Sequence, residues 1–120
     1  MTRSIIAHPD ADTNIKNLPT GLNYFTERGY SQSYPWAEVK RTAKTVTLAK
    51  VHVMRDPDWK PEMHVGGFCA HCSNQLEQTW LFDRLDWDYT RTVRATNLGW
   101  SDRGTIFVEG RAVEFYDYNF

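Results

Sequence analysis

Two thiols and a nearby imidazole in the middle of the chain are the residues whose types and spacing could bind a metal. Cys69 and Cys72 are separated by two residues, and His64 lies upstream. Thiolates and imidazoles with such spacing can hold zinc in a tetrahedral site. A complete site needs four ligands, and the chain contains no second pair of cysteines. We therefore expect no bound cofactor, and Cys69, Cys72 and His64 form the alternative zinc set.

Cys72 is also the candidate nucleophile for covalent chemistry. A catalytic thiol needs a base within hydrogen-bond distance and a third group that orients the base. A small enzyme or a ligand-sequestering protein would use His71, Cys72 and Glu77, but His71 is the direct sequence neighbour of Cys72. The chain also lacks a phosphate-binding glycine loop, a dinucleotide fingerprint and a serine elbow. We expect no catalytic residues, with this enzyme as the alternative.

Polar side chains, several of them amides, crowd the segment that precedes Trp80. An amide offers a donor and an acceptor in one plane, which suits recognition of a peptide backbone or a base edge. The structural alternative is a loop that satisfies itself, because Asn and Gln often bond to neighbouring backbone and Asn74 with Glu77 resembles a helix cap. The predicted binding residues are His71, Ser73, Asn74, Gln75, Glu77, Gln78 and Trp80.

Basic residues on two predicted strands form a second candidate binding surface. They are Lys40, Arg41, Lys44, Arg91 and Arg94. Cations next to exposed aromatic rings are typical of a platform for single-stranded nucleic acid. The formal net charge of −1 lacks the basic excess that usually marks a nucleic-acid-binding domain. Nucleic-acid binding is therefore a further alternative to a solvated strand face.

The elements that would position these residues are mostly strands. From Leu22 onward, runs rich in Thr, Val, Tyr and Trp alternate with Gly, Pro and Asp turns, which is a strand signature. The clearest pattern predicts a hairpin over 36–53 that turns near Ala43 and Lys44. Val46 and Leu48 fall on one face of the second strand, whereas Val51 and Val53 fall on the opposite face. A bulge at Ala49 and Lys50 is therefore predicted, because it would return both pairs to the core.

The remaining chain adds shorter elements to this hairpin. An irregular connection is predicted over 56–67, because Pro and Gly are frequent in it. One helical turn is predicted at 74–77. Further strands are predicted over 79–82, 89–96, 105–108 and 112–116, and the three aspartates within 83–88 predict a hairpin tip.

These elements predict a mostly β fold on a chain of 120 residues, which is long enough for one core. We expect a small single domain over 22–120, built as a strongly bent antiparallel sheet or a partly open SH3-like barrel with a long loop and at most one short helical turn. Residues 1–21 contain few large side chains, and we expect a loosely attached N-terminal arm.

Two features of the sequence favour a cytoplasmic protein with no membrane partner. The apolar run over 5–7 is far shorter than a signal-peptide core or a membrane span. The two cysteines are too close in sequence to staple distant parts of the fold, as small secreted domains require.

The aromatic residues of segment 114–120 predict that the end of the chain docks onto the core or a partner. Together with segments 40–47 and 66–80, this segment resembles a family of small uncharacterised proteins of bacteriophages and bacterial mobile elements. The resemblance implies an accessory protein that acts in a bacterial cytoplasm on host machinery or host defence. It implies no activity.

The leading hypothesis is a non-catalytic binding module that grips a host macromolecule through the 66–80 loop. Protein is the expected partner and nucleic acid is the alternative, while a homodimer stays open.

Overall fold

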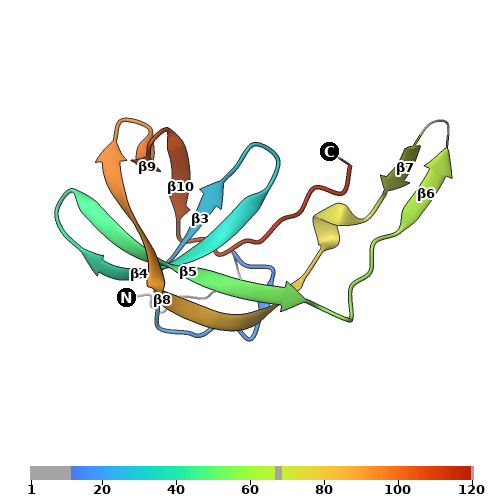
Figure 1. The fold of residues 1–120 in the computed structure, drawn as a ribbon, viewed down its shortest axis with the longest axis horizontal. Coiled ribbons are helices and arrows are strands. Elements are labelled where there is room, and N and C mark those ends of the chain that lie inside the picture. The colour runs from blue at the N-terminus through green and yellow to red at the C-terminus, as the bar shows by residue number, and fades with distance from the viewer. Residues whose placement is uncertain (1–11, 67–68, 120) are drawn as a thin grey trace.

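The computed structural model describes residues 12–66 and 69–119, and these residues form a mostly β domain with one short 3-10 turn (Figure 1). The predicted fold class is confirmed. In the described ranges, no helix is long and apolar enough to cross a membrane. The elements are β2 (Ile15–Lys16), β3 (Tyr24–Arg28), β4 (Ser33–Arg41), β5 (Thr45–Arg55), β6 (Met63–Gly66), β7 (Cys69–Cys72), η2 (Gln75–Glu77), β8 (Trp80–Thr96), β9 (Gly99–Asp102) and β10 (Thr105–Glu109).

Seven of these strands form one strongly bent sheet in the order β2-β8-β5-β4-β3-β10-β9. The end of β8 also pairs with β9, so six strands close into a ring of pairings that we call the barrel. The pairs are antiparallel except for β2, which runs parallel to β8. The sheet is therefore mixed rather than purely antiparallel.

The predicted hairpin over 36–53 is confirmed by β4 and β5. The two strands are joined by a tight turn in which the backbone N–H of Thr42 donates to the carbonyl of Thr45 at 2.8 Å. A register shift between β5 and β8 does occur at the predicted position, between Ala49 and Lys50, but its extra residues belong to β8 and not to β5. Alternation along β5 directs Leu48 and Val51 to opposite faces of the sheet, and each face is covered by a core.

The predicted hairpin tip over 83–88 is wrong, because β8 continues through it as a strand of 17 residues. Ala49 pairs with Thr90 and Lys50 pairs with Asp86, so residues 87–89 bulge out of the ladder. The carboxylate of Asp86 accepts the backbone N–H of Asp88 at 3.2 Å. The aspartates therefore produce a wide bulge instead of a chain reversal.

Two apolar clusters fill the molecule. The first lies inside the barrel and comprises Phe25, Trp36, Val46, Leu48, Val93 and Phe107, all at most 2% exposed. The second lies on the other side of the sheet and comprises Ile15, Leu18, Tyr24, Ala37, Val51 and Ala112. Alternation along β5 directs Leu48 into the first cluster and Val51 into the second.

The second cluster corrects the prediction of a loosely attached arm over 1–21, as far as residues 12–21 are concerned. Ile15 is 4% exposed, and its strand β2 pairs with the start of β8. Leu18 is also a core residue. Two large side chains are enough to attach this segment to the barrel, because both pack into the second cluster. Residues 1–11 lie outside the described residues.

The end of the chain also differs from its prediction. The expected strand over 112–116 is reduced to two isolated bridges, from Ala112 to Thr13 and from Phe115 to Ser33. The following residues leave the barrel and run towards β7, as the red trace in Figure 1 shows. We call residues 111–119 the tail. Strand β9, in contrast, was not predicted from the sequence.

Residues 56–79 project from the barrel, and we call them the extension. They contain β6, β7 and η2, and they give the molecule extents of 52 × 30 × 28 Å (Figure 1). The irregular connection predicted up to residue 67 is wrong in its last part, because β6 pairs with β7 in an antiparallel hairpin. The helical turn predicted at 74–77 is confirmed by η2.

Candidate functional site: the extension and the tail that braces it

The extension is the candidate site, since it contains six of the seven predicted binding residues and Trp80 follows directly. Its most buried polar side chain is Gln78, which is 2% exposed. Gln78 Nε2 donates to the carbonyls of Gln75 at 2.8 Å and Tyr116 at 3.0 Å. Gln78 Oε1 accepts the N–H of Tyr116 at 2.9 Å and the indole N–H of Trp80 at 3.1 Å. Gln78 therefore joins the extension to the tail and is not available to a partner.

The side chains of Asn74 and Gln75 also bond to backbone groups of the same chain. Asn74 Oδ1 accepts the backbone N–H of Glu62 at 2.8 Å, and Asn74 Nδ2 donates to the carbonyl of Lys60 at 2.9 Å. Gln75 Oε1 accepts the backbone N–H of Tyr118 at 2.8 Å. Asn74 makes no side-chain cap bond to η2. The self-satisfied loop, which was the structural alternative, thus describes these amides better than an outward recognition surface.

The tail contributes an amide of its own that the sequence did not single out. Asn119 Oδ1 accepts the backbone N–H of Cys72 at 2.7 Å, and Asn119 Nδ2 donates to the Cys72 carbonyl at 2.9 Å. This pair of bonds occupies the outer edge of β7 as one residue of a neighbouring strand would. The tail therefore docks, as its aromatic residues predict, but it is held largely by hydrogen bonds.

The polar side chains that remain outward come from the hairpin and from η2. His71 and Glu77 are exposed. Ser73 is also exposed, and its hydroxyl lies 2.9 Å from His64 Nε2 and 3.4 Å from Glu62 Oε1. Three of the predicted binding residues can thus reach a partner, and His64 joins them.

The register of β6 against β7 determines which side chains the Cys72 thiol can contact. His64 pairs with His71, and Met63 pairs with Cys72. Paired residues share a face and successive residues alternate, so Cys72 lies on the face opposite to both imidazoles. Cys72 is 1% exposed, and its Sγ donates to Asn74 Oδ1 at 3.4 Å. His71 therefore cannot act as its base.

The alternative zinc set is not assembled by the described atoms. Cys72 and His64 lie on opposite faces of the hairpin, and the side chain of Cys69 lies outside the described residues. Over the part of the chain that the structure describes, no three His, Cys, Asp or Glu residues are placed to share a metal ion.

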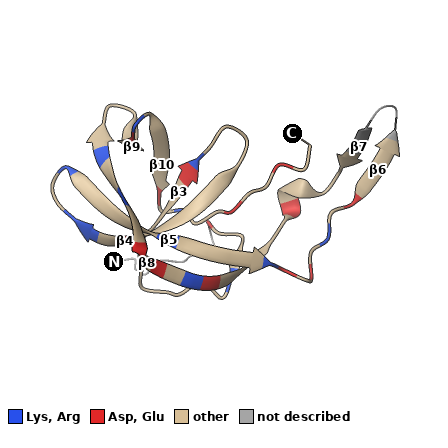
Figure 2. Cartoon of the chain, viewed as in Figure 1, with Lys and Arg blue, Asp and Glu red and all other residues tan. Residues whose placement is uncertain are grey.

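Three large apolar side chains of the extension are exposed to solvent. Val65 is 90% exposed, Leu76 is 88% exposed and Met63 is 46% exposed. The sequences of strands β6 and β7 contain no Lys, Arg, Asp or Glu, and the described part of β6 is tan in Figure 2. The end of the extension is therefore an uncharged surface with prominent aliphatic groups.

The base of the extension is anchored by a buried carboxylate that the sequence analysis missed. Asp56 accepts hydrogen bonds from Lys16 Nζ at 2.7 Å, from Thr79 Oγ1 at 2.6 Å and from the N–H of Asp58 at 3.0 Å. Its bond to Lys16, followed by those to Thr79 and Asp58, lowers the pKa of Asp56 to about 2. Asp56 thus joins the N-terminal segment to the extension.

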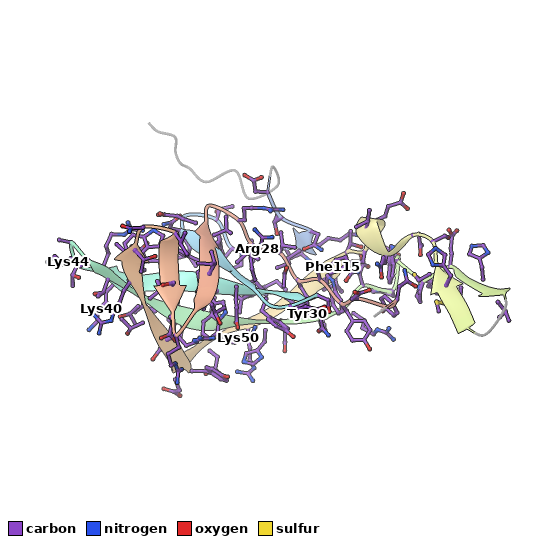
Figure 3. All side chains as sticks on the ribbon, turned by 90° about the horizontal axis from the view of Figure 1, so that it is seen from above. Arg28, Tyr30, Lys40, Lys44, Lys50 and Phe115 are labelled. Carbon is purple, nitrogen blue, oxygen red and sulfur yellow. The ribbon has the colours of Figure 1, made fainter. Side chains whose placement is uncertain are left out.

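The predicted basic face is divided by the fold. Arg41 is held by Glu38 at 2.8 Å and by Glu109 at 2.6 Å. Arg91 is held by Glu27 at 3.2 Å and by Asp102 at 2.9 Å. The other three cations are exposed, and Figure 3 places Lys40 and Lys44 at the barrel end remote from the extension. The five residues therefore do not form one platform; the exposed three are Lys40, Lys44 and Arg94.

A half-buried lysine of β5, Lys50, and a half-buried glutamate of the tail, Glu114, interact electrostatically at the junction of barrel and tail. Figure 3 places Lys50 near the middle of the molecule. Lys50 Nζ lies 4.9 Å from the ring centre of Tyr34 and 5.3 Å from that of Trp36. Burial lowers the pKa of Lys50. Burial also raises the pKa of Glu114 to about 7, against the opposing influence of Lys50. The junction therefore changes its charge near neutral pH.

Comparison of the chain with protein-family models, with curated proteins and with solved structures found no match in any of the three.

Proposed function

We propose that the protein is a non-catalytic binding module that recognises a protein partner through the outer surface of its extension. The exposure of Val65 and Leu76, at 90% and 88%, carries this proposal. Removal of one such aliphatic side chain from water contributes about 1.5–3 kcal/mol. Two of them on one projecting element supply the apolar centre that a protein interface needs.

The bracing of the extension supports the same function. Gln78 and Asn119 fix the extension to the tail before any partner arrives. A surface that is already ordered loses less conformational entropy on association. The amides thus contribute to binding indirectly, by positioning the hairpin. His71 lies on the hairpin face opposite to Val65, so the exposed polar group nearest in sequence to this surface is Glu77, next to Leu76.

The lack of charge on the hairpin favours protein over nucleic acid as the partner. Binding to a phosphate backbone depends on cationic side chains, and the sequences of β6 and β7 contain none. A host protein in the bacterial cytoplasm is the partner that we propose. The bacterial setting rests on the resemblance of segments 40–47, 66–80 and 114–120 alone.

The proposal is tested by capture of partners from bacterial lysate on the immobilised full chain, followed by quantitative mass spectrometry. The variant replaces Val65 and Leu76 by Asp, and the matched control is Leu98→Asp, because Leu98 is 81% exposed in the turn between β8 and β9. We expect the wild type and the control to capture the same protein, and the double variant to lose it at least tenfold. Equal capture by all three proteins would contradict the proposal.

A further inference from the structure

A cavity of about 290 Å³ lies where β5 ends and the extension begins. Its walls come from the end of β5, the connection after it, the start of β8 and the tail. The lining residues are Arg55, Asp56, Pro57, Trp59, Lys60, Pro61, Thr79, Trp80 and Tyr118. This cavity is separate from the exposed hairpin surface, and the proposed protein recognition does not use it.

Rings form most of the cavity wall. The rings of Trp59 and Tyr118 lie 5.6 Å apart between centres and are tilted by 44°. Trp80 adds a third aromatic ring, and Pro57 and Pro61 add two saturated rings. Flat rings of a ligand gain stacking energy against such surfaces. The wall therefore favours a planar aromatic or heteroaromatic ligand over an aliphatic one.

The charged groups of the lining favour an anion. Arg55 Nη2 donates to Tyr118 Oη at 2.8 Å, which leaves the other guanidinium donors without a partner in the described chain. Lys60 is exposed and has no carboxylate partner among the described residues. The one carboxylate of the lining, Asp56, is already neutralised by Lys16 at 2.7 Å. The cavity thus presents two available cations and no available anion.

One donor of the lining lacks an acceptor. Trp59 Nε1 is buried, and within the described residues it makes no hydrogen bond. Because this nitrogen has almost no accessible surface, it faces the protein interior and not the open cavity. Trp59 would therefore offer its ring, and not its N–H, to a ligand in the cavity.

We infer that this cavity binds one nucleotide unit, with the base against the rings of Trp59, Trp80 and Tyr118 and the phosphate at Arg55 and Lys60. The volume of about 290 Å³ lies at the lower end of ligand pockets and suits one nucleotide rather than a dinucleotide cofactor. The unit is either a free mononucleotide or the end of a single strand.

Binding is tested on the full chain by titration calorimetry with AMP, GMP, CMP and UMP. We expect at least one of them to bind with a Kd below about 1 mM. The matching nucleoside should bind at least about tenfold more weakly, because it lacks the charged hydrogen bonds. Failure of all four monophosphates to bind in this range would overturn the inference.

Two variants locate the binding. Replacement of Arg55 and Lys60 by Gln should weaken the monophosphate roughly tenfold or more and leave the nucleoside unchanged. Trp59→Phe reduces the aromatic surface of the cavity wall and should weaken both compounds several-fold. The matched controls are Lys44→Gln with Arg94→Gln, and Trp87→Phe, at exposed positions of the barrel. Unchanged affinity in both cavity variants would overturn the inference, even if a nucleotide binds.

The two sources of the nucleotide are separated with a 5′-phosphorylated tetranucleotide of the preferred base. A free mononucleotide site predicts equal or weaker binding of the tetranucleotide, whereas a strand-end site predicts tighter binding that weakens steeply with salt. In either case the Arg55 and Lys60 variant must lose the interaction, and retention of it would overturn the inference.

Discussion

The barrel and the extension are held together by different forces. Inside the barrel, large side chains such as Trp36, Phe107 and Leu48 are at most 2% exposed and are held mainly by apolar packing. In the extension, the main restraints are hydrogen bonds from Gln78 and Asn119 to backbone groups. Apolar burial is shared among many contacts, whereas each hydrogen bond depends on one geometry. The extension can therefore be loosened without unfolding the barrel, as is general for locally stabilised units.

The largest effect should come from the barrel core. Phe107→Ala removes a side chain that is 1% exposed and packs edge-on against Trp36. Such a truncation costs about 3–5 kcal/mol, because it removes buried apolar surface and leaves a cavity. Urea unfolding should show this loss, and amides in both regions should exchange faster. A change below about 1 kcal/mol, the range expected for the control Trp87→Ala at an exposed position, would contradict the comparison.

A smaller and more local effect should follow from Gln78→Ala. The variant leaves the N–H of Tyr116 and the indole N–H of Trp80 without their acceptor, which should cost roughly 2 kcal/mol. Hydrogen exchange should accelerate at Tyr116 and remain slow at Val93 in the barrel. Gln75→Ala removes a single acceptor and should produce a weaker version of the same pattern. Equal acceleration in both regions would show that the extension and the barrel unfold together.

The junction between the two regions should make stability depend on pH. The buried side chain of Glu114 has its pKa raised from 4.5 to about 7, so the folded protein keeps a proton that the unfolded chain has released. Its contribution to stability is complete below pH 4.5 and is lost as the pH rises towards 7, by at most about 1.4 kcal/mol per unit.

Glu114→Gln should therefore flatten the stability profile between pH 5 and 7, measured by urea unfolding at several pH values. Lys50, Tyr34 and Glu27 contribute to the field at this junction and remain present in the variant. The control is Glu77→Gln at an exposed position of η2. If the stability of Glu114→Gln depends on pH in the same way as that of the wild type, the titration of Glu114 is not the cause of the pH dependence.

The smallest effect on stability should come from Asn119→Ala. Loss of two hydrogen bonds to Cys72 should cost about 1 kcal/mol at the tail and almost nothing in the barrel. The buried thiol of Cys72 should become accessible, and its alkylation rate in a Cys69→Ser background should rise several-fold. An unchanged rate would mean that Asn119 does not keep the edge of β7 closed.

The sequence correctly indicated where the polar side chains gather. It did not indicate that Asn74, Gln75 and Gln78 bond to their own chain instead of facing a partner. Crowded amides on segment 71–78 indicated a special segment, and the structure does use them. Their partners are backbone groups of the tail and the connection, up to 43 residues away in sequence. Nothing in the local pattern distinguishes an amide that faces a partner from one that faces a distant part of its own chain.

The same contrast holds for the fold. The hairpin of β4 and β5 follows from alternation, which is a property of neighbouring residues, whereas the bulge opposite Ala49 and Lys50 lies in β8. The aspartates of 83–88 carry an equally local turn signal, but pairing with β5 kept that segment in β8. Turn chemistry can form a bulge as well as a reversal, and only the neighbouring strand decides between them.

By itself, the sequence determined the β class, the main hairpin and the segment in which polar groups gather, because periodicity and turn residues act over a few positions. The tertiary structure alone decided that Asn119 closes the edge of β7 and that Trp59, Trp80 and Tyr118 share one cavity. These contacts join residues that are 21 to 59 positions apart. They depend on how the barrel directs β5, β8 and the tail to the same end of the molecule.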